Sequence, residues 1–315
     1  MNDKNSDESG TNNRIEVGVL RGEKIKFSID GKPMHAFKGE TIGAALAAAG
    51  IREIRHALPH GDPRGLYCCM GSCHGCLVTV DGQPNVRACM TPIEPDQKVA
   101  LQDGLGNLDM NSPGPVPGRL IRKEVPLVIV GGGPAGLSAA LAAARMGTRV
   151  LVIDENRQAG GQIYRQPPKT YQINDPAWLG DDYIDGQTLL QQVDRLSDKI
   201  TIWNDALVWS VFDSRQLALA RGSDLILLDA GAMVVATGAY ERPVPVPGWT
   251  LPGVMTAGSA QVLIKSQRVR PGRKVLLAGT GPLQLVVANQ MLDVGMDVVA
   301  VAESASTFSA WRYLP

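Results

Sequence analysis

Cysteine is absent from most of this 315-residue chain, because all five cysteines lie between Cys68 and Cys89. A secreted domain held together by disulfide bonds would carry cysteines throughout its length, so this distribution argues against a disulfide framework. A cytosolic, reducing compartment would disfavour disulfide bonds in any case. Five cysteines gathered in one short segment indicate a metal site.

Excess charge and long apolar runs are also missing. Lys plus Arg and Asp plus Glu both number 31, so the formal net charge is zero and gives no electrostatic reason to expect nucleic acid or an anionic membrane as partner. No segment approaches the roughly 20 apolar residues that a membrane-spanning helix needs. Residues 1–14 are polar and lack the layout of a signal peptide, so we expect a disordered tail on a cytoplasmic protein.

The length and a hydrophobic content of 44% are sufficient for two compact domains and part of a third. Residues 15–108 are expected to form the first, a small β-rich domain of the α+β class. The alternation from Glu23 to Asp30 predicts a strand that runs into a hairpin turn. Thr41 is placed to cap a short apolar helix that stops at Gly50, and Asp81-Gly82 marks the tip of a second hairpin.

Four of the cysteines follow the spacing C-x4-C-x2-C-x12-C: Cys68, Cys73, Cys76 and Cys89. The first three match the spacing of plant-type [2Fe–2S] ferredoxins, in which a fourth cysteine follows further on. A loop wrapped round a cluster needs backbone freedom and N–H groups turned toward sulfur. Glycines with positive φ angles would supply that freedom, and the segment has Gly65, Gly71 and Gly75. The spacing therefore predicts a [2Fe–2S] site with these four cysteines as ligands.

Two other interpretations of the cysteines are open. A structural zinc site usually has two C-x2-C pairs, and this segment has one. Ordinary buried cysteines would rarely fall on this spacing. The fifth cysteine, Cys69, lies outside the pattern and is expected to be a small packed residue. His74 is expected to lie on the surface or near the ligands without being one of them.

The pattern changes after a segment rich in proline and glycine, which we interpret as a linker over residues 109–124. Residues 125–250 are expected to form a FAD-binding domain and begin with an apolar run typical of a buried parallel strand. A glycine loop, an alanine-rich helix and a second apolar strand follow, which together predict a βαβ unit. The loop has the form G-x-G-x-x-G, and its residues are expected to face the pyrophosphate of a dinucleotide: Gly131, Gly133, Pro134, Ala135 and Gly136.

An acidic residue at the end of the second strand completes this motif. Asp154 would accept hydrogen bonds from the adenosine ribose, with Glu155 as the neighbouring alternative. Two later segments, G-G-Q and V-A-T-G, favour FAD over NAD because they are placed to return to the cofactor; the residues concerned are Gly161, Gln162, Thr237 and Gly238. A βαβ unit with an empty loop is the alternative. No C-x-x-C pair accompanies this part of the chain, which excludes a disulfide reductase. No side chain stands out as a general base, which fits chemistry carried by cofactors.

Residues 251–315 contain a second βαβ start and are expected to form an incomplete, NAD-type Rossmann-like domain. Its loop has Gln284 where the third glycine should be, and that glycine normally lets helix and strand pack closely. Glu303 is placed as a ribose acceptor after the second strand. The sequence leaves two interpretations open here, binding of NAD(P) or a Rossmann-like unit kept for packing.

The order of these motifs resembles the alpha-type subunits of bacterial amine and imino-acid oxidising complexes, such as opine oxidases, hydroxyproline dehydrogenase, hydrogen cyanide synthase and heterotetrameric sarcosine oxidase. The resemblance extends over residues 25–303 and is carried by two stretches, RGLYCCMGSCHGCLVTVDGQPNVRACMTP and LVIVGGGPAGLSAALAAARMGTRVLVIDENRQAGGQIYRQ. It implies a ferredoxin-like (β-grasp) [2Fe–2S] domain followed by an α/β flavoprotein fold with two dinucleotide-binding domains. It also implies that the four cysteines bind the cluster and that the loop at residues 131–136 binds FAD.

The resemblance further implies that a separate flavin-dependent subunit oxidises an amine or imino acid and passes electrons through this chain. We therefore expect an oxidoreductase that serves as the electron-transfer subunit of a hetero-oligomeric complex. A self-sufficient NAD(P)H-dependent flavin and iron–sulfur reductase is one alternative, and an inactive fragment that only docks a partner is another. Two departures from the family are expected to matter: Cys69 stands where glycine would be expected, and family members continue beyond the position of Pro315, which predicts truncation.

Overall fold

The computed structural model describes residues 12–104, 106, 118–213 and 215–305. The chain falls into two compact units, each built from segments that are distant in sequence. Unit 1 comprises residues 1–108, 167–174 and 241–315, and unit 2 comprises residues 109–166 and 175–240. Within the described part of the chain, no helix is both long and apolar enough to cross a membrane.

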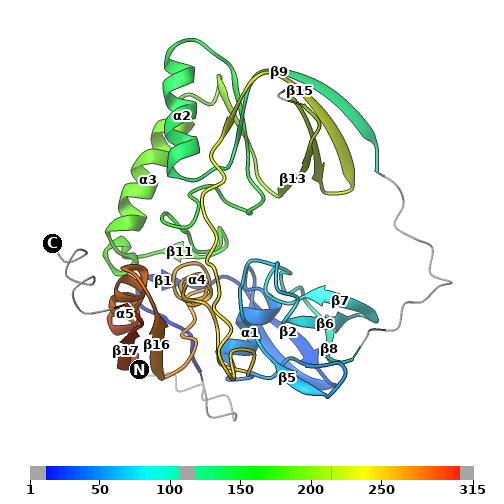
Figure 1. The fold of residues 1–315 in the computed structure, drawn as a ribbon, viewed down its shortest axis with the longest axis vertical. Coiled ribbons are helices and arrows are strands. Elements are labelled where there is room, and N and C mark those ends of the chain that lie inside the picture. The colour runs from blue at the N-terminus through cyan, green and yellow to red at the C-terminus, as the bar shows by residue number, and fades with distance from the viewer. Residues whose placement is uncertain (1–11, 105, 107–117, 214, 306–315) are drawn as a thin grey trace. The chain divides into compact units, whose positions relative to one another are not determined.

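A β-grasp domain forms the N-terminal part of unit 1 (Figure 1). Its sheet has the order β3-β2-β8-β4-β5, and the β6–β7 hairpin joins it through β8. The strands are β2 (Lys24–Ile29), β3 (Lys32–Phe37), β4 (Arg55–Ala57), β5 (Asp62–Arg64), β6 (Leu77–Val80), β7 (Gln83–Arg87) and β8 (Lys98–Asp103). The antiparallel β2–β3 hairpin lies beside a parallel β2–β8 pair. The predicted ferredoxin-like class is therefore confirmed.

The local signals in this domain act as the sequence predicts. Asp30 and Gly31 have positive φ angles of 47° and 77°, as the tight turn between β2 and β3 requires. Thr41 caps α1 (Ile42–Ala48), and its hydroxyl accepts a hydrogen bond from the Ala44 amide at 3.1 Å. The apolar face of α1 then packs into the core of the sheet.

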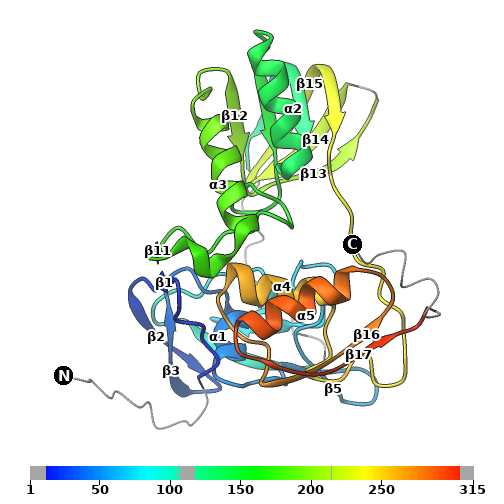
Figure 2. The ribbon, with the colours of Figure 1, turned by 90° about the vertical axis from the view of Figure 1, so that its left-hand side faces the viewer.

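Unit 1 also contains the second βαβ motif. It consists of β16 (Lys274–Gly279), α5 (Leu283–Asp293) and β17 (Asp297–Glu303), and its two strands pair in parallel as expected. A helical segment that the sequence analysis did not predict precedes it. This segment is α4 (Ala257–Gln261), which continues into a π-helical turn, η2 (Val262–Ser266), and α4 lies beside α5 (Figure 2).

The hydrophobic core of the β-grasp domain extends into this helical segment. Leu263 and Val269 are buried in the same cluster as Ile42 and Leu46 of α1, with exposures of 2% and 0%. Burial of each such side chain contributes roughly 1.5–3 kcal/mol. Residues 251–305 thus lie in one compact unit with the cluster domain, and the second βαβ motif has a hydrophobic cluster of its own, while the domain predicted over residues 251–315 stays a prediction.

The N-terminal segment is another part of unit 1. β1 (Val19–Leu20) pairs with β11 (Gln172–Ile173), and Arg14 forms a β-bridge with Val269. Asn13 is buried and donates its side-chain amide to the Ala47 carbonyl at 3.0 Å. The predicted tail is therefore wrong for Asn13 and Arg14, since these contacts come from distant segments that a local pattern does not reveal. Residues 1–11 lie outside the described residues.

The buried carboxylate of Glu40 connects the β-grasp domain to the N-terminal segment and, through Arg21, to the segments that contain Tyr171 and Arg268. Its Oε1 accepts hydrogen bonds from Arg14 Nε at 2.8 Å and from Arg21 Nη1 at 3.0 Å. Arg21 also donates to the Tyr171 hydroxyl and to the Arg268 carbonyl oxygen, both at 2.6 Å. Burial of Tyr171, together with the nearby Glu40, raises the pKa of that phenol above its usual value. Glu40 therefore balances cationic groups that hold the N-terminal segment in place.

Replacing Glu40 with glutamine is expected to lower the free energy of unfolding by about 3–5 kcal/mol, because two largely buried guanidinium groups lose the negative charge that faces them. Urea unfolding followed by circular dichroism would measure the loss. The matched control is Glu94→Gln on the surface, which is expected to change stability by less than about 0.5 kcal/mol. Equal stabilities for the two variants would contradict this interpretation.

His56 on β4 contacts two carboxylates at the surface. Its Nε2 lies 2.7 Å from Glu53 Oε1, and its Nδ1 contacts Asp103. The hydrogen bond to Asp103 is the largest cause that raises the pKa of His56 above 6.5. Protonated His56 therefore stabilises the fold below pH 6.5, and this contribution is lost as the pH rises through the folded-state pKa. NMR titration should give a lower His56 pKa in Asp103→Asn than in the unchanged chain, and identical values would refute the assignment.

Unit 2 is built on a six-stranded sheet in the order β12-β10-β9-β15-β14-β13, parallel from β12 to β15 and antiparallel from β15 to β13. The strands are β9 (Leu120–Val130), β10 (Val150–Ile153), β12 (Ile200–Trp203), β13 (Ala206–Val211), β14 (Gln216–Arg221) and β15 (Asp224–Val235). Two helices, α2 (Pro134–Arg145) and α3 (Asp181–Asp194), lie side by side in Figures 1 and 2, and a short 3-10 helix, η1 (Pro176–Leu179), precedes α3. The predicted first βαβ unit is confirmed as β9-α2-β10.

Two boundaries in this part of the chain differ from the predicted ones. β9 begins at Leu120, inside the predicted linker, because residues 120–124 pair with residues 225–229 of β15. Residues 241–250 group with unit 1 rather than with the predicted FAD-binding domain. Residues 109–117 of the predicted linker lie outside the described residues.

Candidate cluster and flavin sites

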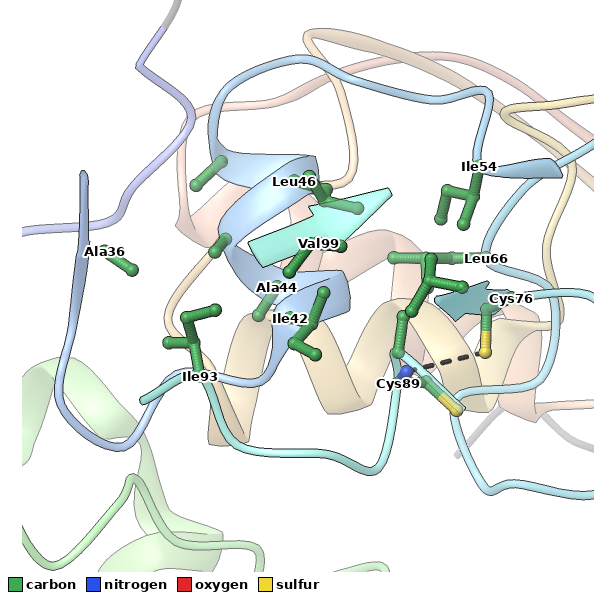
Figure 3. Packing of buried hydrophobic residues seen from close by; sticks show 14 of the residues in the cluster. Ala36, Ile42, Ala44, Leu46, Ile54, Leu66, Cys76, Cys89, Ile93 and Val99 are labelled. Atoms are coloured by element: carbon green, nitrogen blue, oxygen red, sulfur yellow. Dashed lines mark hydrogen bonds between the residues drawn. The ribbon is translucent and has the colours of Figure 1, made fainter. Parts of the chain in front are cut away.

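The four predicted cluster ligands fall into two pairs within unit 1. The Cys68 and Cys73 thiols are hydrogen-bonded to each other, and so are those of Cys76 and Cys89. Figure 3 shows Cys76 and Cys89 side by side, with the Cys89 amide donating to Cys76 Sγ at 3.4 Å. Cys73 is exposed, whereas the other three are buried. One pair therefore reaches the surface while the other lies in the core.

This arrangement fits a two-iron cluster. Each iron of a [2Fe–2S] cluster takes two thiolates and shares two sulfides with the other iron, so the ligands are needed as two pairs. A single zinc ion would instead need its ligands round one point. The pairing of the thiols favours the two-iron interpretation over zinc.

Backbone amides of the loop are directed at the ligand sulfurs, as the sequence analysis expects. The N–H groups of Met70, Ser72 and Cys73 donate to the Cys68 sulfur, and the Gly75 amide donates to Cys73 Sγ at 3.4 Å. The hydrogen bond from the Cys73 thiol is the largest cause that lowers the pKa of Cys68 to about 5, and these amides add to it. The thiolate form that binds iron is thereby favoured at Cys68.

The turns of this loop come partly from residues other than the predicted glycines. Gly71 has a φ of 77°, as expected, but the other left-handed residues are Cys69 at 49° and His74 at 54°. Gly65 has a different role. A side chain at this position would place its Cβ 2.5 Å from the Arg52 carbonyl oxygen, so the close approach of the two backbone segments requires glycine. The prediction that Gly65 and Gly75 take positive φ angles is therefore wrong. The side chain of His74 is exposed, as predicted.

Residues that the sequence analysis did not single out surround the loop. The Cys69 thiol is buried, as expected of a packed residue, and its Sγ lies 2.8 Å from Ser259 Oγ on α4. The Thr256 amide donates to the Tyr67 carbonyl oxygen at 2.9 Å. The rings of Tyr67 and Trp249 meet edge to face with centroids 5.2 Å apart. The T-A-G-S sequence could have signalled a helix start at Thr256, but nothing local could have signalled its contact with the loop.

The predicted FAD residues come together in unit 2, where β9, β10 and β15 end. The Gly131 amide donates to the Ile153 carbonyl oxygen, the Ala236 amide to Val130 and the Gly160 amide to Gly132, each at 2.8 Å. The glycine loop, the G-G-Q segment and the V-A-T-G segment are therefore neighbours. Their convergence is what the sequence analysis expects of a dinucleotide site, while the assignment of each residue to FAD stays a prediction.

The glycines of this site are required by close backbone contacts. Gly131 has a φ of 110°, and a Cβ on it would lie 2.2 Å from the Ala236 carbonyl oxygen. A Cβ on Gly136 would lie 1.9 Å from the Gly131 carbonyl oxygen, and one on Gly161 would lie 2.8 Å from Gly133 Cα. α2 begins directly after Gly133, with Pro134 and Ala135 in its first turn. The N-terminus of α2 has no side-chain cap, so its first amides are available to an anion such as a pyrophosphate.

The two candidate ribose acceptors have different surroundings. Asp154 is buried, and its carboxylate accepts hydrogen bonds from the Gly132 amide at 2.6 Å and from the Asn156 amide at 2.7 Å. Glu155 is exposed and accepts a hydrogen bond from the Tyr240 hydroxyl at 2.6 Å, which raises the pKa of Tyr240 to about 12. The buried Asp154 thus stabilises the conformation of the glycine loop through Gly132, whereas the carboxylate of Glu155 is exposed to solvent.

The remaining predicted FAD residues lie at the same end of the sheet. Gln162 donates its side-chain amide to the Ala239 carbonyl oxygen at 2.6 Å, which joins the G-G-Q segment to the chain after β15. Thr237 is exposed, and Gly238 has a φ of 73°. The chain therefore turns at Gly238 directly after the predicted cofactor contact.

The second glycine loop, in unit 1, is occupied by its own acidic residue. Glu303 Oε2 accepts hydrogen bonds from the Gly281 amide at 3.1 Å and from Gln284 Nε2 at 2.6 Å. Its Oε1 accepts one from the Ala305 amide at 2.9 Å. These donors, with the Ala305 amide as the largest cause, lower the pKa of Glu303 to about 2. The ionised Glu303 carboxylate therefore accepts hydrogen bonds from the loop, including one from the Gly281 amide, which a bound dinucleotide would otherwise use.

Comparisons with known proteins agree with this architecture. Residues 22–104 match the family described as 2Fe-2S iron-sulfur cluster binding domain, and residues 125–311 match the family described as pyridine nucleotide-disulphide oxidoreductase. A solved structure of L-proline dehydrogenase from P. horikoshii superposes with a TM-score of 0.74 at 23% identity. The match covers 93% of this chain and 56% of that one, and it shows the fold.

Among curated relatives, an opine oxidase subunit from Rhizobium meliloti is 41% identical over 207 residues, which are 62% of this chain and 39% of the relative. The alpha subunit of sarcosine oxidase from Corynebacterium sp. (strain P-1) is 28% identical over 320 residues, covering 93% of this chain and 32% of the relative. Hydrogen cyanide synthase subunit HcnB of Pseudomonas aeruginosa is 38% identical over 180 residues, with coverages of 57% and 38%. The chain thus spans well under half the length of these relatives. With a cluster domain ahead of its flavin-dependent oxidoreductase fold, the chain belongs to the pyridine nucleotide-disulphide oxidoreductase family.

Proposed function

We propose that this chain is an electron-transfer subunit, containing FAD and a [2Fe–2S] cluster, of a cytoplasmic complex that oxidises an amine or imino acid. One observation carries the proposal. The same chain contains two pairs of neighbouring cysteines, Cys68 with Cys73 and Cys76 with Cys89, and a glycine loop suited to a dinucleotide. FAD exchanges electrons in pairs, whereas a [2Fe–2S] cluster passes them singly. A chain with both is suited to join a two-electron oxidation to a one-electron acceptor.

The side chains have supporting roles in this proposal. The amides of the cysteine loop would stabilise the anionic sulfurs, and the first turn of α2 would face the pyrophosphate of FAD. The sequence has no cysteine after Cys89, so a reactive disulfide beside the flavin is not part of the proposal. Relatives named as subunits of opine oxidase, sarcosine oxidase and hydrogen cyanide synthase support a place in a hetero-oligomer with a separate amine-oxidising subunit.

The second glycine loop supports this proposal over a self-sufficient NAD(P)H-dependent reductase. Glu303 takes up loop donors, and the buried Gln284 holds that carboxylate in place. Asp154 makes a corresponding contact with Gly132 in the first loop, so the feature that distinguishes the second loop is Gln284 in place of the third glycine. We therefore infer that the loop is kept for packing and that electrons do not enter through a nicotinamide.

The test is anaerobic mixing of the purified chain with NADH, with NADPH, and with sarcosine, L-proline or an opine, while flavin absorbance is followed. Dithionite is expected to reduce both flavin and cluster, whereas neither nicotinamide nor amine alone bleaches the flavin. Reduction by the amine is expected once an amine-oxidising flavoprotein encoded beside this chain is added. Bleaching by NADH without a partner would overturn the proposal in favour of the reductase. A purified chain that lacks flavin and gives no EPR signal after dithionite would support an inactive docking fragment instead.

A further inference from the structure

We propose that Ser259 is a positioning residue for the iron–sulfur cluster, because its hydroxyl holds Cys69 in the backbone turn that aims loop amides at a ligand sulfur. Ser259 Oγ lies 2.8 Å from Cys69 Sγ, and both side chains are buried. Ser259 is separated from the cysteine loop by 190 residues in sequence. This inference rests on the proposed cluster site and goes beyond it, since it assigns a role to a residue outside the loop.

Cys69 has a backbone conformation that side chains with a Cβ rarely adopt. Its φ is 49°, in the left-handed region where glycine is normally preferred. A residue held there needs contacts that compensate for the strain. The hydrogen bond to Ser259, in a site where both residues are buried, supplies such a contact. It also explains why a cysteine at this place is compatible with the turn.

The turn at Cys69 determines where the next amide points. Cys69 lies between the ligand Cys68 and Met70, and the Met70 amide donates to the Cys68 sulfur, together with those of Ser72 and Cys73. Rotation of the Cys69 backbone toward an ordinary conformation would turn the Met70 amide away from that sulfur. Hydrogen bonds to ligand sulfurs stabilise the extra negative charge of a reduced cluster and so raise its reduction potential.

Ser259 is itself held firmly enough to serve as an anchor. Its amide donates to Thr256 Oγ1 at 3.1 Å, in the capping contact that starts α4. The Thr256 amide donates to the carbonyl oxygen of Tyr67 at 2.9 Å. The residues on both sides of Cys68, Tyr67 and Cys69, are therefore hydrogen-bonded to the same helical turn. α4 fixes the ligand from both directions along the chain.

The test is a redox titration of the complete chain with its cofactors, in which the cluster is followed by EPR. Ser259→Ala is expected to shift the cluster midpoint to a more negative potential and to broaden its EPR signal. Ser266→Ala is the matched control, a partly buried serine a few residues further on, and is expected to match the unchanged chain. Cys69→Ser keeps a polar partner for Ser259 and should titrate close to the unchanged chain, whereas Cys69→Ala should shift as Ser259→Ala does.

A double-mutant cycle decides whether the two residues act through each other. The double variant with alanine at both positions is expected to shift no further than either single variant. Equal midpoints for Ser259→Ala and Ser266→Ala would overturn the inference, and so would shifts that add in the double variant. If Ser259→Ala fails to retain a cluster, the comparison of Cys69→Ala with Cys69→Ser decides the matter, since equal midpoints for these two would also overturn it.

The same measurements separate this inference from the proposed function. An unchanged chain that binds iron and titrates by EPR but accepts no electrons from an amine-oxidising partner would contradict the proposed function alone. The shifts in the variants would still decide the role of Ser259. An unchanged chain that binds no cluster would overturn both.

Discussion

Replacing Cys76 with alanine is expected to abolish the [2Fe–2S] cluster, with loss of the chain's iron, its visible cluster absorption and its EPR signal after reduction. Cys76 is 2% exposed and shares the inner thiol pair with Cys89. Without Cys76, one iron would keep only the Cys89 thiolate. Both positions are buried, so water cannot easily reach this iron as a replacement ligand. Because cluster binding stabilises the folded state, the melting temperature of the variant is expected to fall as well.

The matched control for this variant is Cys69→Ser. Cys69 is also buried, at 7% exposed, and adjoins a ligand without belonging to either pair. We expect this variant to keep its full iron content. Iron analysis and EPR on the two purified proteins distinguish them directly. If Cys76→Ala retained the cluster, or if both variants lost it, the assignment of four ligands and one packed cysteine would be wrong.

Replacing Gly131 with alanine is expected to weaken FAD binding by at least roughly a hundredfold, or about 3 kcal/mol. The new Cβ would lie 2.2 Å from the Ala236 carbonyl oxygen, so the glycine loop and the V-A-T-G segment would have to separate. That movement displaces the backbone which is expected to approach the pyrophosphate. Titration of the apoprotein with FAD, followed by flavin fluorescence, would measure the change.

Gly147→Ala provides a control for backbone strain alone. Gly147 follows α2 with a φ of 91°, close to the 110° of Gly131, but a Cβ there would meet nothing within 4 Å. It is expected to lower stability by about 1 kcal/mol while leaving FAD affinity unchanged. Similar losses of FAD affinity in both variants would mean that strain, and not the cradle, explains the effect.

Much of the fold could be predicted because its signals are local. The turns at Asp30-Gly31 and Asp81-Gly82 rest on residues that tolerate positive φ angles, and the cap at Thr41 is a single side-chain contact. The βαβ units could be recognised because an apolar strand, a glycine loop and an apolar helix follow one another within about 30 residues. Each of these features needs no knowledge of distant parts of the chain.

The features that the sequence did not predict depend on distant segments. The start of β9 at Leu120 is determined by its pairing with β15, about 100 residues later in the chain, and neither strand reveals this alone. The role of Glu40 depends on Arg14, which pairs with Val269, and on Arg21, which contacts residues 267–268.

For the candidate site, the spacing of the cysteines and glycines predicts which residues converge, because that spacing reflects the chemistry of each cofactor. It could not reveal Ser259 as a neighbour of the cysteine loop in the folded chain. It also misplaced the left-handed turns of the cysteine loop. Glycine is the residue that tolerates such turns best, yet the buried Cys69 and the exposed His74 adopt them here.

The burial of Leu263 and Val269 in the β-grasp core has a consequence for the order of events during synthesis. The ribosome completes the cysteine segment long before it reaches Val269. The ferredoxin-like part of the nascent chain therefore cannot complete its hydrophobic core until Leu263 and Val269 have been synthesised. Until then, the cysteine loop lacks the helical turn that clamps Tyr67 and Cys69. We therefore expect the cysteine loop to stay incomplete during most of translation and to reach its folded form only after residues 256–269 have emerged.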